Sequence, residues 1–468
     1  MRKFIGFIII LIIMMCSYCF AAVNVPEDIR VGLYSGTKAV SSFTVSSKSG
    51  MQIGLVNKEG EFELIEEFSE DEEILIKRGS KSNKVYVEGI GEIGDNENFV
   101  RIIPNESNDI ALLEVNDNNY RGEIEIRRFS SSDMTVINVL PMQEYLYGVV
   151  PREIGGNSPI EAVKAQAIIA RTYAAKNYDK RSKWAFNVTN TVDDQAYGGY
   201  DWENPNSNNA VDETDGMVAT YDGELIGGYY FSTSGGYTES SVNVWGGNVE
   251  YLEAVPDPYE PDNLAKTTWT VTYTKEEIKE LLAKRGIDIG EITDMVINEF
   301  SDAGRVLELE IIGTKDSYIL NKSNARTYLN LNSQWFTIND DEPEIPEYTI
   351  YKEDIEIHEE EEIEDVEEFE DEVEEEEKKE EMKPLLSKLV SFITGENVKT
   401  EENEIDEDTE KIKVNYNARK KVVDTFEIKG RGWGHSVGMS QNGAIGMAKN
   451  DFSCEEIIKW YYKGVEIE

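Results

Sequence analysis

The sequence has few of the residues that bind transition metals or form disulfides: two histidines and three cysteines among 468 residues. Cys16 and Cys19 lie in an apolar N-terminal stretch, so Cys454 alone remains in the folded part and cannot form a disulfide within it. His358 lies in a run of glutamates and His435 in a glycine-rich turn. A zinc site made of several histidines or cysteines is therefore excluded, and we infer no metal and no cofactor.

Basic residues are half as numerous as acidic ones: 46 Lys and Arg stand against 92 Asp and Glu, a formal net charge of −46. An acidic surface repels other polyanions, so we expect no nucleic-acid partner and no general affinity for anionic lipid. More than half of the excess lies between Asp340 and Glu410, where 33 residues are acidic and 6 are basic. The rest of the chain is acidic to an ordinary degree and apolar enough to form a core.

The N-terminus combines positive charge with an apolar run. Two basic residues precede the run from Phe4 to Cys16, which is the pattern of an export signal or a signal anchor. Spanning a membrane takes about 20 apolar residues, so this run is short unless Ser17–Val23 belongs to it. Cleavage after Ala21 is the alternative, but we favour an uncleaved anchor over residues 1–23, with the body outside the cytoplasm.

The next hundred residues predict a β-rich region. Short β-rich runs separated by Gly, Asn, Ser and Asp clusters extend from about Val25 to Leu140 and indicate five to eight strands. A long helix follows over Pro159–Tyr178. Ser158 is positioned to cap it, proline suits its first turn, and Glu161 completes a capping box.

Strand and helix patterns alternate further along the chain. The stretch "YDGEL" at 221–225 predicts a hairpin turn, and "TKEEIKELLAKRG" predicts a short helix capped by Thr274 and ended by Gly286. The last stretch predicts a strand, a glycine-rich turn, a helix and a closing amphipathic helix. The fold class expected is α+β: a mixed, β-rich domain with a central long helix and a C-terminal helix.

A charged segment interrupts this pattern. Residues 339–412 contain glutamate runs and few aromatic residues, so they cannot bury enough apolar surface to fold and are predicted to be mostly disordered. Structure-forming patterns resume over 413–468. We therefore interpret the acidic segment as an insertion into a single domain that occupies residues 24–338 and is completed by the last segment.

Glu153 is the strongest candidate for chemistry. It follows the apolar stretch "YGVVP" and precedes Gly155 and Gly156, so we expect it in a loop before the long helix. Apolar surroundings raise the pKa of a carboxyl group, which suits a general acid. Lys164 and Arg171 are seven residues apart and share one helical face. Either they order a polar site beside Glu153, or a buried Arg171 pairs with an acid and only holds the loop.

Three stretches resemble the signature blocks of the SpoIID/LytB family, the relatives of stage II sporulation protein D. They are "INVLPMQEYLYGVVPREIGGNSPIEAVKAQAIIARTYAAKN" at 137–177, "GGYYFSTSGGYTESSVNVWGGNVEYLEAVPDP" at 227–258 and "GRGWGHSVGMSQNGAIGMA" at 430–448. The blocks are long, specific and in the family's order. The similarity covers about Pro26–Ile338 and Val414–Glu468.

The resemblance implies a role in the bacterial cell wall. SpoIID-like members are peptidoglycan lytic transglycosylases that cut between N-acetylmuramic acid and N-acetylglucosamine in strands lacking stem peptides, in sporulation-related wall remodelling. LytB-like members are enhancers of a wall amidase. We therefore expect an enzyme whose partner is the peptidoglycan glycan strand, with a non-enzymatic amidase enhancer as the alternative. Its implied location is the outer face of the cytoplasmic membrane, or the cell wall after secretion.

The resemblance also assigns site residues. The family's catalytic acid falls on Glu153. Its other polar motif positions, which bind substrate or order the site, fall on Lys164, Gln166 and Arg171 in the first block, Ser232, Ser234, Gly235 and Gly236 in the second, and His435, Ser440 and Gln441 in the third. Ser436 departs from the family, which usually has glycine after the histidine. Some relatives bind zinc between the first two blocks, but the stretch at 184–200 has neither Cys nor His, so no metal is implied.

Two further sets of residues bear on this chemistry. Ordinary glycoside hydrolysis uses two carboxylates, whereas transglycosylation needs one group that acts first as acid and then as base. The candidates for a second carboxylate are Asp193, Asp194 and Asp212, with surface acids in turns as the alternative for all three. The candidates for aromatic faces that stack on sugars are Trp184, Trp202, Trp245 and Trp433, with ordinary core packing as the alternative.

Overall fold

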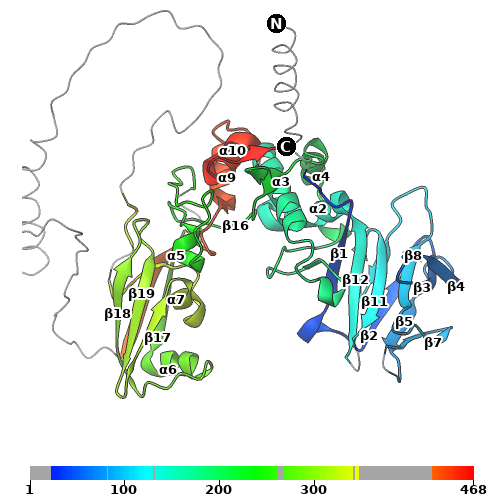
Figure 1. The fold of residues 1–468 in the computed structure, drawn as a ribbon, viewed down its shortest axis with the longest axis horizontal. Coiled ribbons are helices and arrows are strands. Elements are labelled where there is room, and N and C mark those ends of the chain that lie inside the picture. Colours follow the sequence, from blue (N-terminus) through cyan, green and yellow to red (C-terminus); the bar gives the residue numbers. More distant parts are fainter. Residues whose placement is uncertain (1–22, 82, 130–131, 262–266, 341–342, 347–423) are drawn as a thin grey trace, which may run out of the picture. The chain divides into compact units, whose positions relative to one another are not determined.

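The computed structural model describes six stretches of the chain, drawn in colour in Figure 1: residues 23–81, 83–129, 132–261, 267–340, 343–346 and 424–468. The predicted anchor and nearly all of the predicted acidic insertion lie outside these stretches. The described fold is α+β and strand-rich, with several sheets, as the sequence predicted. None of the helices described is long and apolar enough to cross a membrane.

Two sheets form the N-terminal region. The seven-stranded sheet has the order β13 (Val188–Thr189), β1 (Asp28–Tyr34), β12 (Met134–Pro141), β11 (Glu123–Arg128), β8 (Phe99–Pro104), β3 (Met51–Val56) and β4 (Phe62–Phe68). The six-stranded sheet has the order β10 (Asn118–Tyr120), β9 (Leu113–Val115), β2 (Ser42–Ser46), β5 (Ile74–Arg78), β6 (Val85–Val87) and β7 (Gly91–Ile93). The predicted five to eight strands were too few: twelve precede residue 142, several of only three residues.

A buried ionic cluster stabilises the larger sheet. Glu125 on β11 is fully buried and contacts three guanidinium groups, those of Arg30 at 2.7 Å, Arg101 at 2.9 Å and Arg127. Burial alone would raise the pKa of Glu125, but the positive charges of Arg30 and Arg127, with hydrogen bonds from Arg30 and Arg101, hold it at about 2. The carboxylate is therefore ionised throughout the neutral range and depends on its arginines.

Strand β12 leads directly into the helices that position the candidate acid. Helix α2 (Met142–Val150) continues into a single π-helical turn, η2 (Pro151–Gly155), and the chain then enters α3 (Ile160–Lys176). Glu153 therefore lies in a helical turn, and the expected loop was wrong. A π turn inserts an extra residue into a helix and is frequent at functional sites.

The long helix was predicted correctly, but its capping box was wrong. The N-cap of α3 is Pro159, and no side chain caps the helix. Ser158 instead donates its hydroxyl to the carbonyl of Ile154 in the π turn, at 2.7 Å. Glu161 accepts from the backbone N–H of Cys454, at 2.8 Å. Neither side chain caps the helix, because Ser158 bonds within the preceding π turn and Glu161 bonds to a distant segment.

Helix α3 is the central helix of the described fold. Thirteen of its seventeen residues are buried, and it packs against α2, α4 (Pro205–Glu213), α9 (Gln441–Ala448) and α10 (Cys454–Tyr461). Its many alanines explain this, because small side chains let several helices approach one backbone closely. Shorter elements are η1 (Gly36–Lys38), η3 (Ser182–Trp184), η4 (Tyr200–Trp202), α5 (Ser241–Trp245) and α7 (Ser323–Tyr328).

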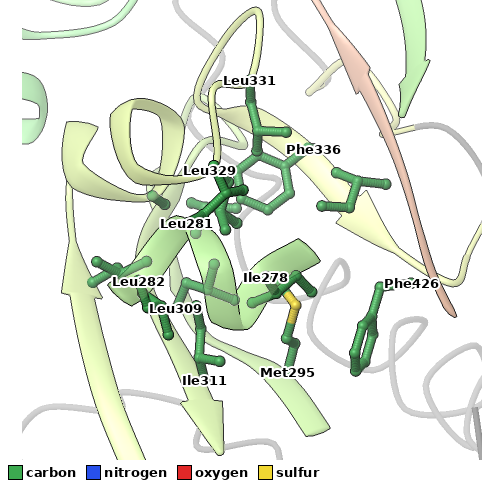
Figure 2. Close-up of a cluster of buried hydrophobic side chains, with 14 of the residues drawn as sticks. Ile278, Leu281, Leu282, Met295, Leu309, Ile311, Leu329, Leu331, Phe336 and Phe426 are labelled. Atoms are coloured by element: carbon green, nitrogen blue, oxygen red, sulfur yellow. The ribbon is translucent and has the colours of Figure 1, made fainter. Parts of the chain in front are cut away.

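A further core forms around two three-stranded sheets. One has the order β17 (Thr268–Thr274), β22 (Thr425–Arg431), β21 (Trp335–Ile338), and the other β18 (Ile292–Phe300), β19 (Val306–Gly313), β20 (Ser317–Asn321). Figure 2 shows how Ile278, Met295, Leu309, Phe336 and Phe426 from five different elements meet in it. Ile278 belongs to α6 (Lys275–Ala283), whose predicted cap at Thr274 is confirmed and forms a capping box with Glu277. Strand β22, from the far side of the acidic segment, is the central strand of its sheet.

Short strand pairs bring the last segment beside the middle of the chain. Strand β14 (Ala219–Tyr221) pairs with β15 (Glu224–Leu225) and with β24 (Glu466–Ile467). The predicted hairpin turn is confirmed: Asp222 and Gly223 both have positive φ, as a two-residue turn of this kind requires. Strand β16 (Tyr230–Phe231) pairs in parallel with β23 (Met439–Ser440), which joins the second and third sequence blocks.

Replacing Glu125 tests the ionic cluster. Glu125→Ala leaves three arginines without their shared partner, so we expect the free energy of unfolding to fall by about 3–5 kcal/mol in urea titrations at pH 7. In the parent this contribution is present above pH 4.5 and is lost as the pH falls through the depressed pKa of about 2. Glu97→Ala removes an exposed pair with Lys58 and should change stability by less than about 1 kcal/mol. Equal losses in the two variants would contradict the assignment.

Candidate active site

The carboxyl group of Glu153 is half-buried and held by donors from three distant segments. Its Oε1 accepts from the backbone N–H of Ala196 at 2.7 Å, and its Oε2 accepts from Nε2 of Gln441 at 3.3 Å. The hydroxyl of Tyr230 donates the remaining hydrogen bond. The site thus combines the first block, the stretch after α3, strand β16 and the start of α9.

Opposing effects set the proton affinity of Glu153. Loss of hydration raises its pKa above the ordinary value and outweighs the hydrogen bonds from Ala196, Gln441 and Tyr230 and the charge of Arg152, which all lower it. The carboxyl is therefore more readily protonated than a surface glutamate, while three donors are in place for its ionised form. A group balanced in this way can both release and recover a proton.

A second layer of hydrogen bonds fixes Tyr230. Gln195 donates to the Tyr230 hydroxyl at 3.2 Å and to the carbonyl of Ala170 on α3, and it accepts from the Tyr145 hydroxyl at 3.1 Å. The Tyr230 hydroxyl therefore has its own proton free to donate to Glu153. The sequence did not identify Gln195 or Tyr230, although both lie in or between the quoted blocks, because neither is acidic, basic or nucleophilic.

Of the polar residues predicted on α3, Gln166 lies nearest to Glu153 by its contacts. Its Oε1 accepts from the same Gln441 side chain, at 3.4 Å, and the residue is fully buried. Its Nε2 has no hydrogen-bond partner within the described stretches. Gln166 therefore orients Gln441 rather than contacting a ligand directly.

Lys164 and Arg171 have no hydrogen bond or ion pair to Glu153. Lys164 pairs with Glu161 at 3.0 Å and with Glu213 at 2.6 Å. Arg171 is buried, and its guanidinium donates to neutral acceptors, namely the carbonyls of Met217 and Val211 and the side chain of Gln143. Burial lowers its pKa to about 10. Arg171 thus holds backbone together, as one of the two interpretations expected, but through carbonyls and not through an acid.

Two of the four second-block positions, Ser234 and Gly235, bind another carboxyl group. Glu260 accepts from the backbone N–H groups of Ser234 and Gly235 and from the hydroxyls of Ser234 and Ser440. Gly236 follows at a φ of 120°, which favours glycine. Ser232 is half-buried, and its hydroxyl shares a hydrogen bond with that of Thr233. The sequence did not single out Glu260, because "PDPYEPD" has the composition of a surface turn.

His435 lies in an aromatic cluster and remains neutral. Its Nδ1 accepts from the backbone N–H of Val437 at 3.1 Å, and its other ring nitrogen donates to the carbonyl of Tyr230. Its ring lies 5.3 Å from that of Trp245 and 5.5 Å from that of Phe231. Burial, with the charge of Arg326, lowers its pKa to about 4. His435 is therefore linked to Glu153 through Tyr230 and is not a proton donor near neutral pH.

Residues 434–438 also match Gly-x-Ser-x-Gly, the mark of a serine-hydrolase nucleophile. That role requires an exposed hydroxyl hydrogen-bonded to a base. Ser436 is buried, and its Oγ has no hydrogen-bond partner among the residues described. Its φ of 67° lies in the region that favours glycine, the residue expected here from the resemblance. The match is therefore a strained turn rather than a nucleophile.

None of the three candidates for a second carboxylate contacts Glu153 in the described structure. Asp194 is paired with Lys180 at 2.7 Å and with Arg181 at 2.5 Å. Asp212 accepts from the Tyr147 hydroxyl at 2.5 Å, and Asp193 is exposed. Despite burial, which acts in the opposite direction, hydrogen bonds from Arg181 and Lys180 lower the pKa of Asp194. The site therefore contains one carboxyl group available for proton transfer.

Trp202 is the candidate aromatic residue associated with Glu153. The Arg152 guanidinium lies over its ring at 4.1 Å from the centroid, and 51% of Trp202 is exposed. Arg152 precedes Glu153 in the π turn. Trp184 forms a similar pair with Lys183 at 5.4 Å, packs edge-on against Phe129 and is 45% exposed. The two pairs are chemically alike, but only the first adjoins Glu153.

Comparisons to known proteins identify a family domain over the first sequence block. The family model described as "Stage II sporulation protein" matches residues 130–221, which contain Glu153 and the whole of α3, so the chain carries a SpoIID family domain. A second family model, described as a domain of unknown function, matches residues 243–352.

The chain is a distant homologue of two Bacillus subtilis proteins. It is 29% identical to an amidase enhancer over 322 residues, which is 69% of this chain but 40% of the enhancer's length. It is 24% identical to stage II sporulation protein D over 359 residues, 74% of this chain and 79% of that protein. The stage II sporulation protein D of Bacillus amyloliquefaciens is 30% identical over 188 residues, 36% of this chain and 54% of that protein.

Removing the Gln441 amide should make Glu153 a weaker acid. Its hydrogen bond lowers the pKa of Glu153, so we expect Gln441→Leu to raise that pKa, read from the ¹³C shift of the side-chain carboxyl against pH. Asn442→Leu is the matched control, because Asn442 follows in the same helix but bonds to Ser232 and Thr233. An unchanged Glu153 titration in Gln441→Leu would show that the contact is not made in solution.

Proposed function

We propose that this protein is a peptidoglycan lytic transglycosylase in which Glu153 is the single acid and base. The observation that carries the proposal is the half-buried Glu153 carboxyl, with a raised pKa and hydrogen bonds to Ala196, Gln441 and Tyr230. The kinship with stage II sporulation protein D supports the substrate, which is the glycan strand of the cell wall between N-acetylmuramic acid and N-acetylglucosamine.

The reaction needs two proton transfers through one carboxyl group. Protonated Glu153 donates to the glycosidic oxygen as its bond to the anomeric carbon breaks, and the anomeric centre becomes electron-poor. The muramic acid's own 6-hydroxyl then bonds to that carbon, and Glu153 takes the hydroxyl proton. The products are a 1,6-anhydro end and a free 4-hydroxyl on the glucosamine. No water is consumed, and the carboxyl returns to its starting form.

The surroundings of Glu153 favour this chemistry over hydrolysis with two carboxylates. Asp194 is neutralised by Lys180 and Arg181, and no hydrogen bond or ion pair joins another acid to Glu153 in the part of the chain described. The transient carboxylate is stabilised by Ala196, Gln441 and Tyr230, donors that are already oriented before the reaction. Location outside the cytoplasmic membrane belongs to this proposal, because glycan strands are found there.

Glu153→Gln removes the transferable proton and tests the proposal directly. We expect formation of 1,6-anhydro ends on peptide-free glycan strands, measured by mass spectrometry, to fall by about 10²- to 10⁴-fold. The turnover rate of the parent should be greatest at pH values below the raised pKa of Glu153 and decline as the pH rises through it, because the acid must start protonated.

Glu144→Gln is the matched control for that variant. Glu144 lies on the preceding helix and also has a pKa raised by burial, but its charged neighbour is Arg121. Its replacement should leave turnover within about twofold, since it takes no part in proton transfer. Equal activity of Glu153→Gln and the parent would contradict the proposed role of Glu153.

A second function is favoured by the relative named as an amidase enhancer. In that case the protein binds glycan strands and accelerates a wall amidase without cutting them. Incubation of peptide-free strands with the parent alone would then leave them unchanged. Addition of the protein to an amidase and intact wall would increase peptide release, and Glu153→Gln would do so equally well.

Trp202 should contribute to glycan binding. Its exposed ring stacks with Arg152, the residue before Glu153. We therefore expect Trp202→Ala to weaken binding of peptide-free strands to the inactive Glu153→Gln variant by about fivefold, a loss of about 1 kcal/mol. Trp184→Ala is the control and should bind like its parent, because the Trp184 pair has no contact with the site. Isothermal titration calorimetry measures both, and equal affinities would exclude Trp202 from the binding surface.

A further inference from the structure

A pair of buried carboxyl groups, those of Asp257 and Glu260, is not among the groups that hydrogen-bond to Glu153. Asp257 is 1% exposed and Glu260 is 7% exposed, and neither forms an ion pair with a described residue. Burial raises the pKa of both, and the charge of Asp257 raises that of Glu260 further. Two negative charges on neighbouring carboxyl groups that are buried from water would strongly destabilise the folded protein. The pair therefore retains a proton near neutral pH.

The hydrogen bonds indicate which carboxyl carries the proton. Glu260 accepts four bonds, and two of them come from the backbone N–H groups of Ser234 at 2.9 Å and Gly235 at 2.5 Å, which can only donate. Both its oxygens are thus engaged as acceptors, as in an ionised carboxylate. Asp257 accepts from the Tyr461 hydroxyl at 2.9 Å, while its Oδ2 has no partner among the described residues. The hydroxyls of Ser234 and Ser440 lie within hydrogen-bond reach of Asp257 and would lower its pKa by donating to it, but both already donate to Glu260.

The other charged group near the pair is Arg305. Its guanidinium is buried and donates to the carbonyls of Ser234, Tyr237 and Thr238, the same turn whose N–H groups bind Glu260. Its charge interacts with Glu260 and with Glu239. Arg305 therefore favours one negative charge on the pair and does not neutralise two.

The pair is connected to Glu153 through helix α9. The Ser440 hydroxyl donates to Glu260 at 3.2 Å and accepts from the backbone N–H of Gly443, so it is the N-cap of that helix. Gln441, the next residue, donates to Glu153. A Cβ atom on Gly443 would lie 2.3 Å from Asp257 Oδ1 and 2.4 Å from its Oδ2. The backbone of the first turn of α9 therefore packs directly against the Asp257 carboxyl.

We propose that Asp257 and Glu260 share one proton, carried by Asp257, and that ionised Glu260 is a positioning residue which fixes the start of α9 and thereby holds Gln441 against Glu153. The inference rests on the proposed function only for the use made of Glu153. The arrangement also explains why the Ser-Gly-Gly turn of the second block and the Ser-Gln pair of the third occur together: Ser234, Gly235 and Ser440 bind the same carboxylate.

Two isosteric variants distinguish the carboxyls. Asp257→Asn resembles the neutral acid, so we expect it to fold, to leave the Glu153 titration unchanged and to keep turnover within about twofold. Glu260→Gln presents an amide NH₂ to groups that donate, so we expect it to displace α9, to raise the pKa of Glu153 as Gln441→Leu does, and to lower kcat by about tenfold to a hundredfold with a smaller change in KM. The opposite order of effects would overturn the assignment of the proton.

The pH dependence of unfolding supplies a readout that needs no turnover. Burial raises the pKa of the pair, so the folded protein holds a proton that the unfolded chain has lost above pH 4.5. Stability from this source is greatest at low pH and declines up to about pH 7, by up to about tenfold in the unfolding constant per pH unit. This part of the slope should be absent in Asp257→Asn, and an unchanged slope would overturn the shared proton.

Ser440 keeps the test decisive if Glu260→Gln does not fold. Ser440→Ala removes the hydroxyl that joins Glu260 to α9, so it should raise the pKa of Glu153, and Ser440→Thr should restore it because threonine keeps the donor. An unaltered Glu153 titration in folded Ser440→Ala would refute the positioning role. The titration and unfolding results stand whether or not the parent cleaves glycan, so a failure of this inference is distinct from a failure of the proposed function.

Discussion

The structure depends on accommodating one carboxyl group away from bulk water. Glu153 lies in a π turn whose sequence supplies no donors to it, and its hydrogen bonds come from Ala196, Tyr230 and Gln441. A polar group that loses water must find such partners or it opposes folding. The parallel pairing of β16 with β23 brings two of these donors together, so the sheet and the site form as one unit.

Features that depend on neighbouring residues were predictable from the sequence. The helix cap at Thr274, the Asp222–Gly223 hairpin turn and the long α3 helix all follow from short patterns, and all three are present. Glu153 was identified for the same reason, since its apolar flanks already indicate lost hydration. The capping box at Ser158 was a local pattern too, but Cys454, 293 residues away from Glu161, competes for that side chain.

The remaining site residues could not be predicted, because their roles come from long-range contacts. Glu260 acquires its role from Ser440, 180 residues later, and from Ser234, whereas its own surroundings in the sequence resemble an exposed turn. Arg171 was expected to interact with a charged group, but its guanidinium donates to backbone carbonyls. Every residue has a backbone carbonyl, so the sequence does not indicate which ones it binds. Resemblance to a family indicated Gln166, Ser234, Ser440 and Gln441 as polar motif residues, but it could not say which of them contact one another.

The place of β22 in its sheet has a consequence for the timing of folding. This strand lies between β17 and β21, which are made more than eighty residues earlier, and the segment that follows it delivers Gln441 and ends in β24. A nascent chain emerging from the ribosome can therefore form the N-terminal sheets and α3 first. The Glu153 carboxyl lacks its hydrogen bond from Gln441 until residue 441 has been synthesised. The set of hydrogen-bond donors around Glu153 is therefore completed late in synthesis, when Gln441 becomes available.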